Sequence, residues 1–166
     1  MSRRCTHALL GSAALALAGC AQPQPRVRAE LNREASVVGN LPANPLHWRV
    51  ISASMDTDRA TMSTLYGNDV AVAYARSHGD HDYPAGAIIS LVTWTQKEDP
   101  RWYGAQIPNH VQSVEFVFVT AAPDGRPSYT YQRFSGSPLM KSSADEASAA
   151  NARAATILAQ RAAVLP

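Results

Sequence analysis

The chain has 166 residues, of which 46% are hydrophobic and 17% charged, a balance typical of a globular domain and unlike that of a disordered chain. Two of its 15 basic residues, Arg3 and Arg4, lie in an N-terminal stretch without acidic residues, so the remaining basic residues equal the 13 acidic ones. Because a nucleic-acid partner requires clustered Lys and Arg in excess, this charge balance argues against one.

The first twenty residues have the three parts of a bacterial export signal. The two arginines precede an apolar run at positions 8–16, which is shorter than the roughly 20 residues that span a bilayer but suits the core of a signal peptide. Leu17-Ala18-Gly19-Cys20 follows and resembles the lipobox of bacterial lipoproteins. We therefore expect residues 1–19 to be a signal peptide and Cys20 to carry lipid. An ordinary signal peptide with a chance cysteine is the alternative.

The two cysteines limit the chemistry of the mature chain. Cys5 lies in the expected signal peptide and Cys20 is the expected lipid site, which leaves no free thiol in the domain. Disulfides, cysteine-ligated zinc, iron–sulfur clusters and thioether-linked haem are thereby excluded. Ala21 follows Cys20 where some sorted lipoproteins have Asp, and this resemblance favours an anchor in the outer membrane with the domain facing the periplasm.

Residues 20–46 are predicted to form a flexible tether. Gln22-Pro23-Gln24-Pro25 cannot form a helix, and the prolines and asparagines of residues 40–45 repeat this effect. From His47 onward the pattern becomes that of a folded domain, so we place the domain at residues 47–166.

Strand patterns dominate this domain. Two apolar runs, 87–95 and 111–120, are the strongest strand candidates. Pro123-Asp124-Gly125-Arg126 is a turn sequence that joins 111–120 to 128–134 as a hairpin. The other expected elements are strands at 48–54 and 61–66, a short helix from Asn68 or Asp69 to Ala75, and a polar loop at 77–84.

The C-terminal segment is predicted to be a helix over 143–164. Ser143 and Glu146 have the spacing of a capping box. An apolar stripe at helical period follows, made of Ala150, Ala154, Ile157, Leu158 and Leu165. The whole order of elements predicts an α+β domain, mainly an antiparallel sheet packed on one face by the short helix and the C-terminal helix.

Two histidines and two aspartates gather in His78-Gly79-Asp80-His81-Asp82. Such side chains are ligands for zinc and other divalent ions, which makes His78 and His81 weak metal candidates. The pattern favours a solvated polar loop instead, because His-x-x-His lacks the helical i, i+4 spacing that places both rings on one face.

Five other residues are candidates for a ligand pocket. His47 and His110 flank strands, where either is an axial haem ligand or a residue at a strand end facing water. Tyr66 and Trp94 belong to strands, as pocket walls or as ordinary core. Glu115 interrupts an apolar strand; alternation places it opposite its neighbours, as an exposed residue or a buried acid–base group.

Several segments in order resemble the cytochrome P-460 family. They contain an Asn-Asp helix cap, a Pro-x-Gly turn that begins a strand, and a later strand with an acidic-aromatic pair. The matching residues are Thr64-Leu65-Tyr66-Gly67-Asn68-Asp69-Val70-Ala71, Tyr83-Pro84-Ala85-Gly86-Ala87-Ile88-Ile89, Trp94, Lys97-Glu98-Asp99-Pro100-Arg101-Trp102-Tyr103-Gly104-Ala105 and Val114-Glu115-Phe116.

The resemblance implies a periplasmic, mostly β protein, often a homodimer, with a c-type haem cross-linked to a lysine. This sequence departs from that pattern in two places. The Cys-x-x-Cys-His expected near the C-terminus is replaced by the Ala-rich segment 143–164, and the lysine position falls on Leu91, with Lys97 further along the chain. Covalent haem is therefore not expected, although non-covalent haem held by His110 or His47 stays an alternative.

Two functions follow from these observations. The first is a non-catalytic envelope lipoprotein that binds a small molecule or a partner, with an apolar cavity between sheet and helix. The second is a b-type haem protein that acts on hydroxylamine or nitric oxide. A further hypothesis, which assigns no ligand, is a purely structural lipoprotein module without a ligand-sized pocket. The missing haem motif and lysine favour the first.

Overall fold

The computed structural model describes residues 32–77, 82–143 and 147–163. The expected signal peptide, Cys20 and the candidates His78 and His81 lie outside these residues, as do Glu146 of the capping box and Leu165. No helix among the described residues is long and apolar enough to cross a membrane.

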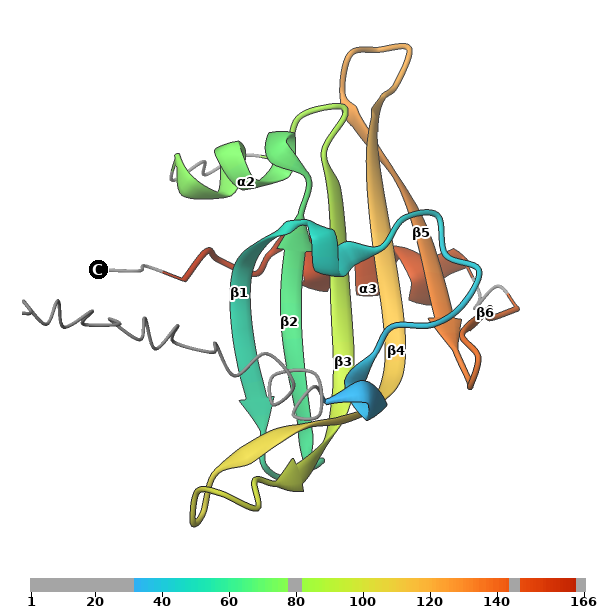
Figure 1. Ribbon diagram of the computed structural model, residues 1–166. Helices are drawn as coiled ribbons and strands as arrows, with labels where there is room; N and C mark the ends of the chain where they lie inside the picture. Colours follow the sequence, from blue (N-terminus) through green and yellow to red (C-terminus); the bar gives the residue numbers. More distant parts are fainter. Residues whose placement is uncertain (1–31, 78–81, 144–146, 164–166) are drawn as a thin grey trace, which may run out of the picture. The chain divides into compact units, whose positions relative to one another are not determined.

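Six antiparallel strands form one sheet in which each strand pairs with the next along the chain (Figure 1). The expected α+β fold with an antiparallel sheet is confirmed. The strands are β1 (Arg49–Asp56), β2 (Thr61–Gly67), β3 (Ile88–Glu98), β4 (Gln106–Ala121), β5 (Pro127–Ser135) and β6 (Met140–Lys141).

The strands β3 and β4 continue beyond their predicted ends. Apolar alternation ends near Thr95 and begins near Val111, yet the backbone pairing goes on from Trp94 opposite Val111 to Glu98 opposite Gln106. Register shifts on both sides of Trp94 accommodate the extra residues. The extension pairs the polar residues Gln96, Lys97 and Glu98 with Pro108, Ile107 and Gln106, and this stretch has no apolar alternation for hydrophobic periodicity to detect.

Two helices cover one face of the sheet, which we call the helix face. The first, α2 (Asp69–Arg76), begins at Asn68, whose side-chain oxygen accepts a hydrogen bond from the Ala71 amide. The second, α3 (Ala147–Leu158), runs behind the sheet in Figure 1. Ala71 and Val72 of α2 and Ala154 and Ile157 of α3 join a buried cluster with the sheet residues Ile89, Leu91 and Val117.

The α3 helix is shorter than the sequence predicts. It ends at Leu158, and the chain beyond it leaves the helical path so that the Ala163 amide donates to the carbonyl of Ile51 on β1. This bond to an edge strand competes with continued helix formation, and the Ala-rich sequence alone gives no sign of it.

The opposite face is covered by residues 32–48, which we call the strap. The strap contains two short 3-10 turns, η1 (Arg33–Ala35) and η2 (Pro45–His47), and passes in front of the sheet in Figure 1. Its apolar side chains pack on a buried cluster from β3, β4, β5 and the segment after β5, which consists of Val92, Trp94, Val114, Phe116, Phe134 and Leu139.

The strap corrects the expected tether. Residues 32–46, which the prolines assign to a flexible linker, lie on the sheet because Val37 and Leu41 contact the apolar cluster and Pro45 is buried. Gly39 forms a bridge with Leu139, and a side chain there would overlap the Leu139 backbone. Prolines limit helix formation, but they do not prevent an extended segment from packing.

Candidate functional site

A row of hydroxyl groups crosses the helix face of the sheet. Ser54 of β1 is paired with Ser63 of β2, Ser63 with Thr93 of β3, and Thr93 with Ser113 of β4. The Ser63 and Thr93 hydroxyl oxygens lie 3.0 Å apart in a hydrogen bond, and Ser113 is buried. Residues directly opposite in an antiparallel sheet share a face, so this register gathers four hydroxyl side chains into one polar floor.

The next row holds a buried ion pair. Glu115 of β4 lies between Leu91 of β3 and Arg133 of β5 in the register and is only 2% exposed. Arg153 of α3 reaches its carboxylate with two hydrogen bonds, Nε to Oε1 at 2.9 Å and Nη2 to Oε2 at 2.7 Å. The Tyr131 hydroxyl donates a third to Oε1. Paired, bidentate geometry of this kind allows a carboxylate to remain charged when it is buried.

The ion pair determines the protonation states of its members. Burial raises the pKa of Glu115, but the hydrogen bonds from Arg153 and Tyr131 outweigh burial and hold the pKa below its usual 4.5. Burial and the bond to Glu115 raise the pKa of the Tyr131 phenol. The hydrogen bond to Glu115 likewise raises the pKa of Arg153. At neutral pH this cluster therefore contains a carboxylate, a guanidinium and a neutral phenol.

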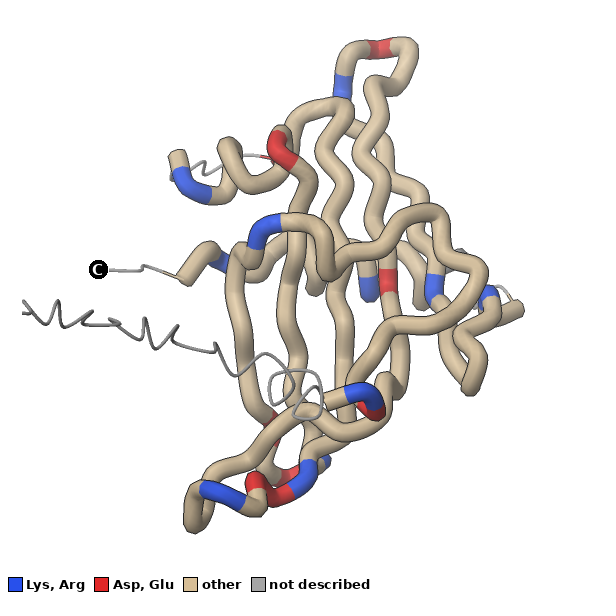
Figure 2. The backbone as a smooth tube through the Cα atoms, in the orientation of Figure 1, with Lys and Arg blue, Asp and Glu red and all other residues tan. Residues whose placement is uncertain are grey.

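A cavity of about 590 Å³ on the helix face is lined by the hydroxyl row together with Glu115 and Arg153. The lining is polar apart from Leu91 and comes from the sheet, from the β1–β2 turn, from α3 and from the segment just beyond the end of α3. It comprises Ser54, Asp56, Arg59, Thr61, Ser63, Leu91, Thr93, Gln112, Ser113, Glu115, Arg133, Arg153 and Gln160. Charged residues are otherwise sparse in the middle of the sheet (Figure 2). The cavity lies between sheet and helix as the first functional reading expects, but it is polar and not apolar.

The charges that line the cavity do not all cancel. Arg59 bonds to Asp56 at 3.0 Å, and Arg153 neutralises Glu115. The guanidinium of Arg133 has no ion pair within the part of the chain that the structure describes. The lining thus carries one more positive than negative charge, and Arg133 is the residue that supplies it.

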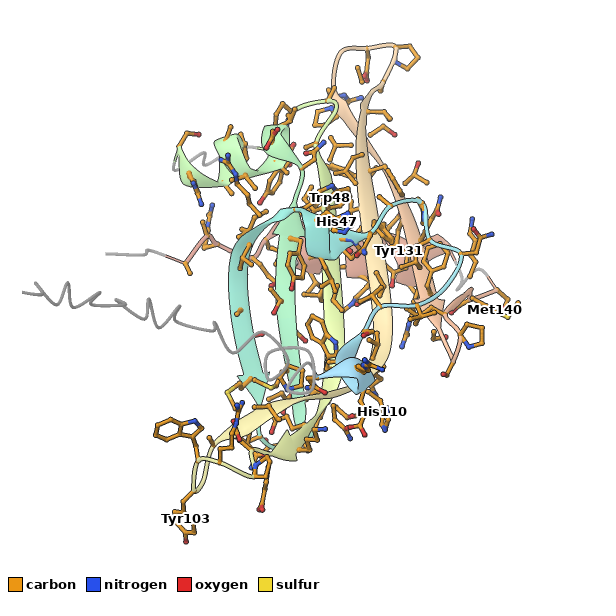
Figure 3. The ribbon with its side chains drawn as sticks, viewed as in Figure 1. His47, Trp48, Tyr103, His110, Tyr131 and Met140 are labelled. Carbon is orange, nitrogen blue, oxygen red and sulfur yellow. The ribbon has the colours of Figure 1, made fainter. Side chains whose placement is uncertain are left out.

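The residues singled out from the sequence are not brought together. Glu115 lines the cavity, whereas Tyr66 and Trp94 belong to the strap face, where the Trp94 indole donates to the Ala35 carbonyl at 2.9 Å. Both histidines are exposed. Figure 3 places His47 on the strap and His110 well away from it, lower in the view on β4.

Metal binding finds no support in the part of the chain that the structure describes. Residues 32–77, 82–143 and 147–163 contain no group of three or more His, Cys, Asp or Glu side chains arranged to hold an ion.

The exposed aromatic residues Trp102 and Tyr103 lie in the β3–β4 connection, where Tyr103 points away from the sheet (Figure 3).

Arg133, Arg153 and the hydroxyl row were missed by sequence reasoning. One signal for Arg133 was available, since the turn at 123–126 fixes the hairpin register and thereby places Arg133 opposite Glu115. Arg153 offered no such signal, because the alanine-rich helix had no predicted orientation relative to the sheet. The hydroxyl row depends on the register of four strands, which short apolar runs do not determine.

The sequence model of one protein family, Cytochrome P460, matches residues 42–154. The chain belongs to the cytochrome P460 family. The matched region starts within the strap, ends in α3 and includes every cavity residue except Gln160. A comparison with curated proteins found none that matches the chain.

Haem is the cofactor expected from a cytochrome P460 fold, and the cavity does not fit it. Among the described residues that line the cavity there is no His, Cys, Met or Lys to serve as an axial or cross-linking group. Leu91, at the position where the resemblance expects the cross-linking lysine, is part of the lining. Tyr131 bonds to Glu115 through its hydroxyl. The donor set offers guanidinium, hydroxyl and amide groups, which suit a small polar molecule.

Proposed function

We propose that this chain is a lipid-anchored envelope protein, facing the periplasm from the outer membrane, whose cytochrome P460 domain binds a small polar molecule without catalysing a reaction. The observation that carries the proposal is the polar cavity beside Glu115. Its volume of about 590 Å³ falls within the range of small-molecule sites. Its lining lacks the side chains that hold haem.

The state of Glu115 supports a non-catalytic role. A general acid or base needs a pKa near the working pH and a free position for the proton it transfers. The pKa of Glu115 is held low, and Arg153 and Tyr131 occupy both carboxylate oxygens. The carboxylate is thus held as a fixed structural charge that positions Arg153 at the cavity wall.

The haem question is tested by an absorption spectrum and a pyridine haemochrome assay of the full chain exported to a haem-supplied periplasm. We expect a colourless protein that does not change the spectrum of added haemin. A Soret band with stoichiometric haem would overturn the proposal. If replacing His110 or His47 then removed that band, the proposed function would give way to the alternative, a b-type haem protein acting on hydroxylamine or nitric oxide.

Lipid anchoring is tested by growing cells with labelled palmitate. The label should enter the wild-type chain and the Cys5→Ser variant, because Cys5 lies in the expected signal peptide, and it should be lost from Cys20→Ser. Membrane fractionation should find the labelled chain with the outer membrane. Equal labelling of the wild type and Cys20→Ser would refute the anchor.

A further inference from the structure

We infer that the ligand of the cavity is a small hydroxylated carboxylate, held by its carboxylate on Arg133 and by its hydroxyl groups on the hydroxyl row of Ser54, Ser63, Thr93 and Ser113. This inference rests on the proposed function, because it assigns a ligand class to the same cavity. It comes from the charge balance of the lining and from the register of the sheet.

The charge argument concerns Arg133. Arg153 is engaged by Glu115 through both carboxylate oxygens, and Arg59 is engaged by Asp56. Arg133 lies beside Glu115 on the neighbouring strand and keeps its guanidinium without an ion pair within the described residues. Guanidinium groups bind carboxylates through two parallel hydrogen bonds. The single excess positive charge matches a monoanion better than a phosphate dianion.

The hydroxyl argument concerns the cavity floor. Ser54, Ser63, Thr93 and Ser113 each offer one donor and two acceptor positions, and Gln112 and Gln160 add amide groups at the wall. Gln112 reaches the cavity because it lies in the register shift opposite β3, between Val111 and Ser113. Such a surface recognises a molecule that both donates and accepts hydrogen bonds, as a polyol chain does. A purely apolar chain would find only Leu91 as a matching contact.

Isothermal titration separates the two parts of this recognition. The probes are gluconate, which has a carboxylate and hydroxyls, glucose, which has hydroxyls alone, and hexanoate, which has a carboxylate alone. All three have six carbons. We expect gluconate to bind at least tenfold more tightly than either of the others, because only gluconate satisfies both Arg133 and the hydroxyl row.

Two variants and one control assign the contacts. Arg133→Gln should weaken gluconate at least tenfold and leave glucose unchanged, and Thr93→Val should weaken both gluconate and glucose. Arg126→Gln is the matched control, because Arg126 lies in the β4–β5 turn, pairs with exposed Asp124 and does not line the cavity. Circular dichroism and the melting temperature of each variant establish that it is folded.

The outcomes distinguish this inference from the proposed function. A colourless protein that binds gluconate no more tightly than glucose, or that keeps full gluconate affinity in Arg133→Gln, overturns the carboxylate assignment. A colourless protein that binds none of the probes overturns the whole ligand assignment and leaves the haem-free fold of the proposed function in place. A stoichiometric haem spectrum in the same preparation overturns the proposed function as well. Tight gluconate binding that is lost only in Arg133→Gln and Thr93→Val supports both.

Discussion

Replacing Arg153 by Met is the most informative perturbation of the buried ion pair. The variant keeps most of the side-chain volume but leaves the Glu115 carboxylate with the Tyr131 hydroxyl as its remaining side-chain partner. Removing one member of a buried pair costs about 3–5 kcal/mol when the other charge stays buried. The Glu115 side chain is 3% exposed and Arg153 is 43% exposed, so the cost falls mainly on the carboxylate.

The free energy of unfolding should fall by about 2–4 kcal/mol at pH 7. This is less than the usual cost of a broken buried pair, because Tyr131 still donates a hydrogen bond to Glu115 and Glu115 can take up a proton. For a domain of this size that corresponds to a fall in Tm of about 10 °C. The pH dependence should also change sign. In the wild type the lowered pKa of Glu115 contributes stability above its unfolded value of 4.5, which is lost as the pH falls through the folded value.

In Arg153→Met we expect burial, the largest single influence on Glu115, to outweigh the remaining effects of Tyr131 and Arg133 and to raise the pKa of Glu115 above 4.5. The variant therefore loses stability as the pH rises through that raised value, so its deficit is larger at pH 8 than at pH 5. Urea unfolding followed by tryptophan fluorescence at both pH values measures this difference. Glu115→Gln combined with Arg153→Met should recover much of the loss, because no buried charge then remains.

A matched control for this experiment is Arg126→Met. Arg126 also binds a carboxylate, that of Asp124, at 2.7 Å, but both side chains are largely exposed. Exposed pairs contribute little, so its unfolding midpoint should stay at the wild-type value. Wild-type stability of Arg153→Met, or a deficit that is equal at pH 5 and pH 8, would refute the account of Glu115 as a buried charge held by Arg153.

Three further predictions concern the α2 cap and the strap. Asn68→Ala removes the cap of α2 and its bond to the Ile88 amide at 3.1 Å, and should cost about 1–2 kcal/mol in urea unfolding, whereas an unchanged midpoint would contradict the capping role. Gly39→Val places a side chain against the Leu139 backbone, so limited proteolysis should cut the strap faster than in the wild type. Trp94→Phe removes the donor to the strap and should speed amide hydrogen exchange across residues 35–48, with no such change in α2.

Part of this fold follows directly from local sequence signals. The sequence predicts Asn68 or Asp69 as the cap of α2, and Asn68 is the cap, because its short side-chain acceptor directly precedes the helical pattern. The 123–126 turn joins β4 to β5 for a similar reason. Both features depend on residues close together in the chain, whose preferences agree with the final structure.

The strap and the cavity depend on contacts between distant residues. Prolines made residues 32–46 resemble a linker, and only the apolar cluster around Phe116, contributed by strands much later in the chain, gives Val37 and Leu41 a surface to bind. Alternation places Glu115 on the face opposite Val114 and Phe116, but its burial depends on Arg153 in a helix whose docking the sequence does not specify. Period-two alternation gives the face of a residue and not its partners.

The two faces of the sheet have different roles, the strap face in stability and the helix face in ligand binding. On the strap face, Trp94, Phe116 and Phe134 are almost fully buried, and each such side chain contributes about 1.5–3 kcal/mol without any cofactor. On the helix face, α2 and the inner residues of α3 pack on Ile89 and Val117, and the polar rows of Glu115 and Ser113 are left beside an open cavity. Because the apolar clusters are complete without a ligand, the cavity can exchange small molecules while the sheet stays folded, as a binding protein requires.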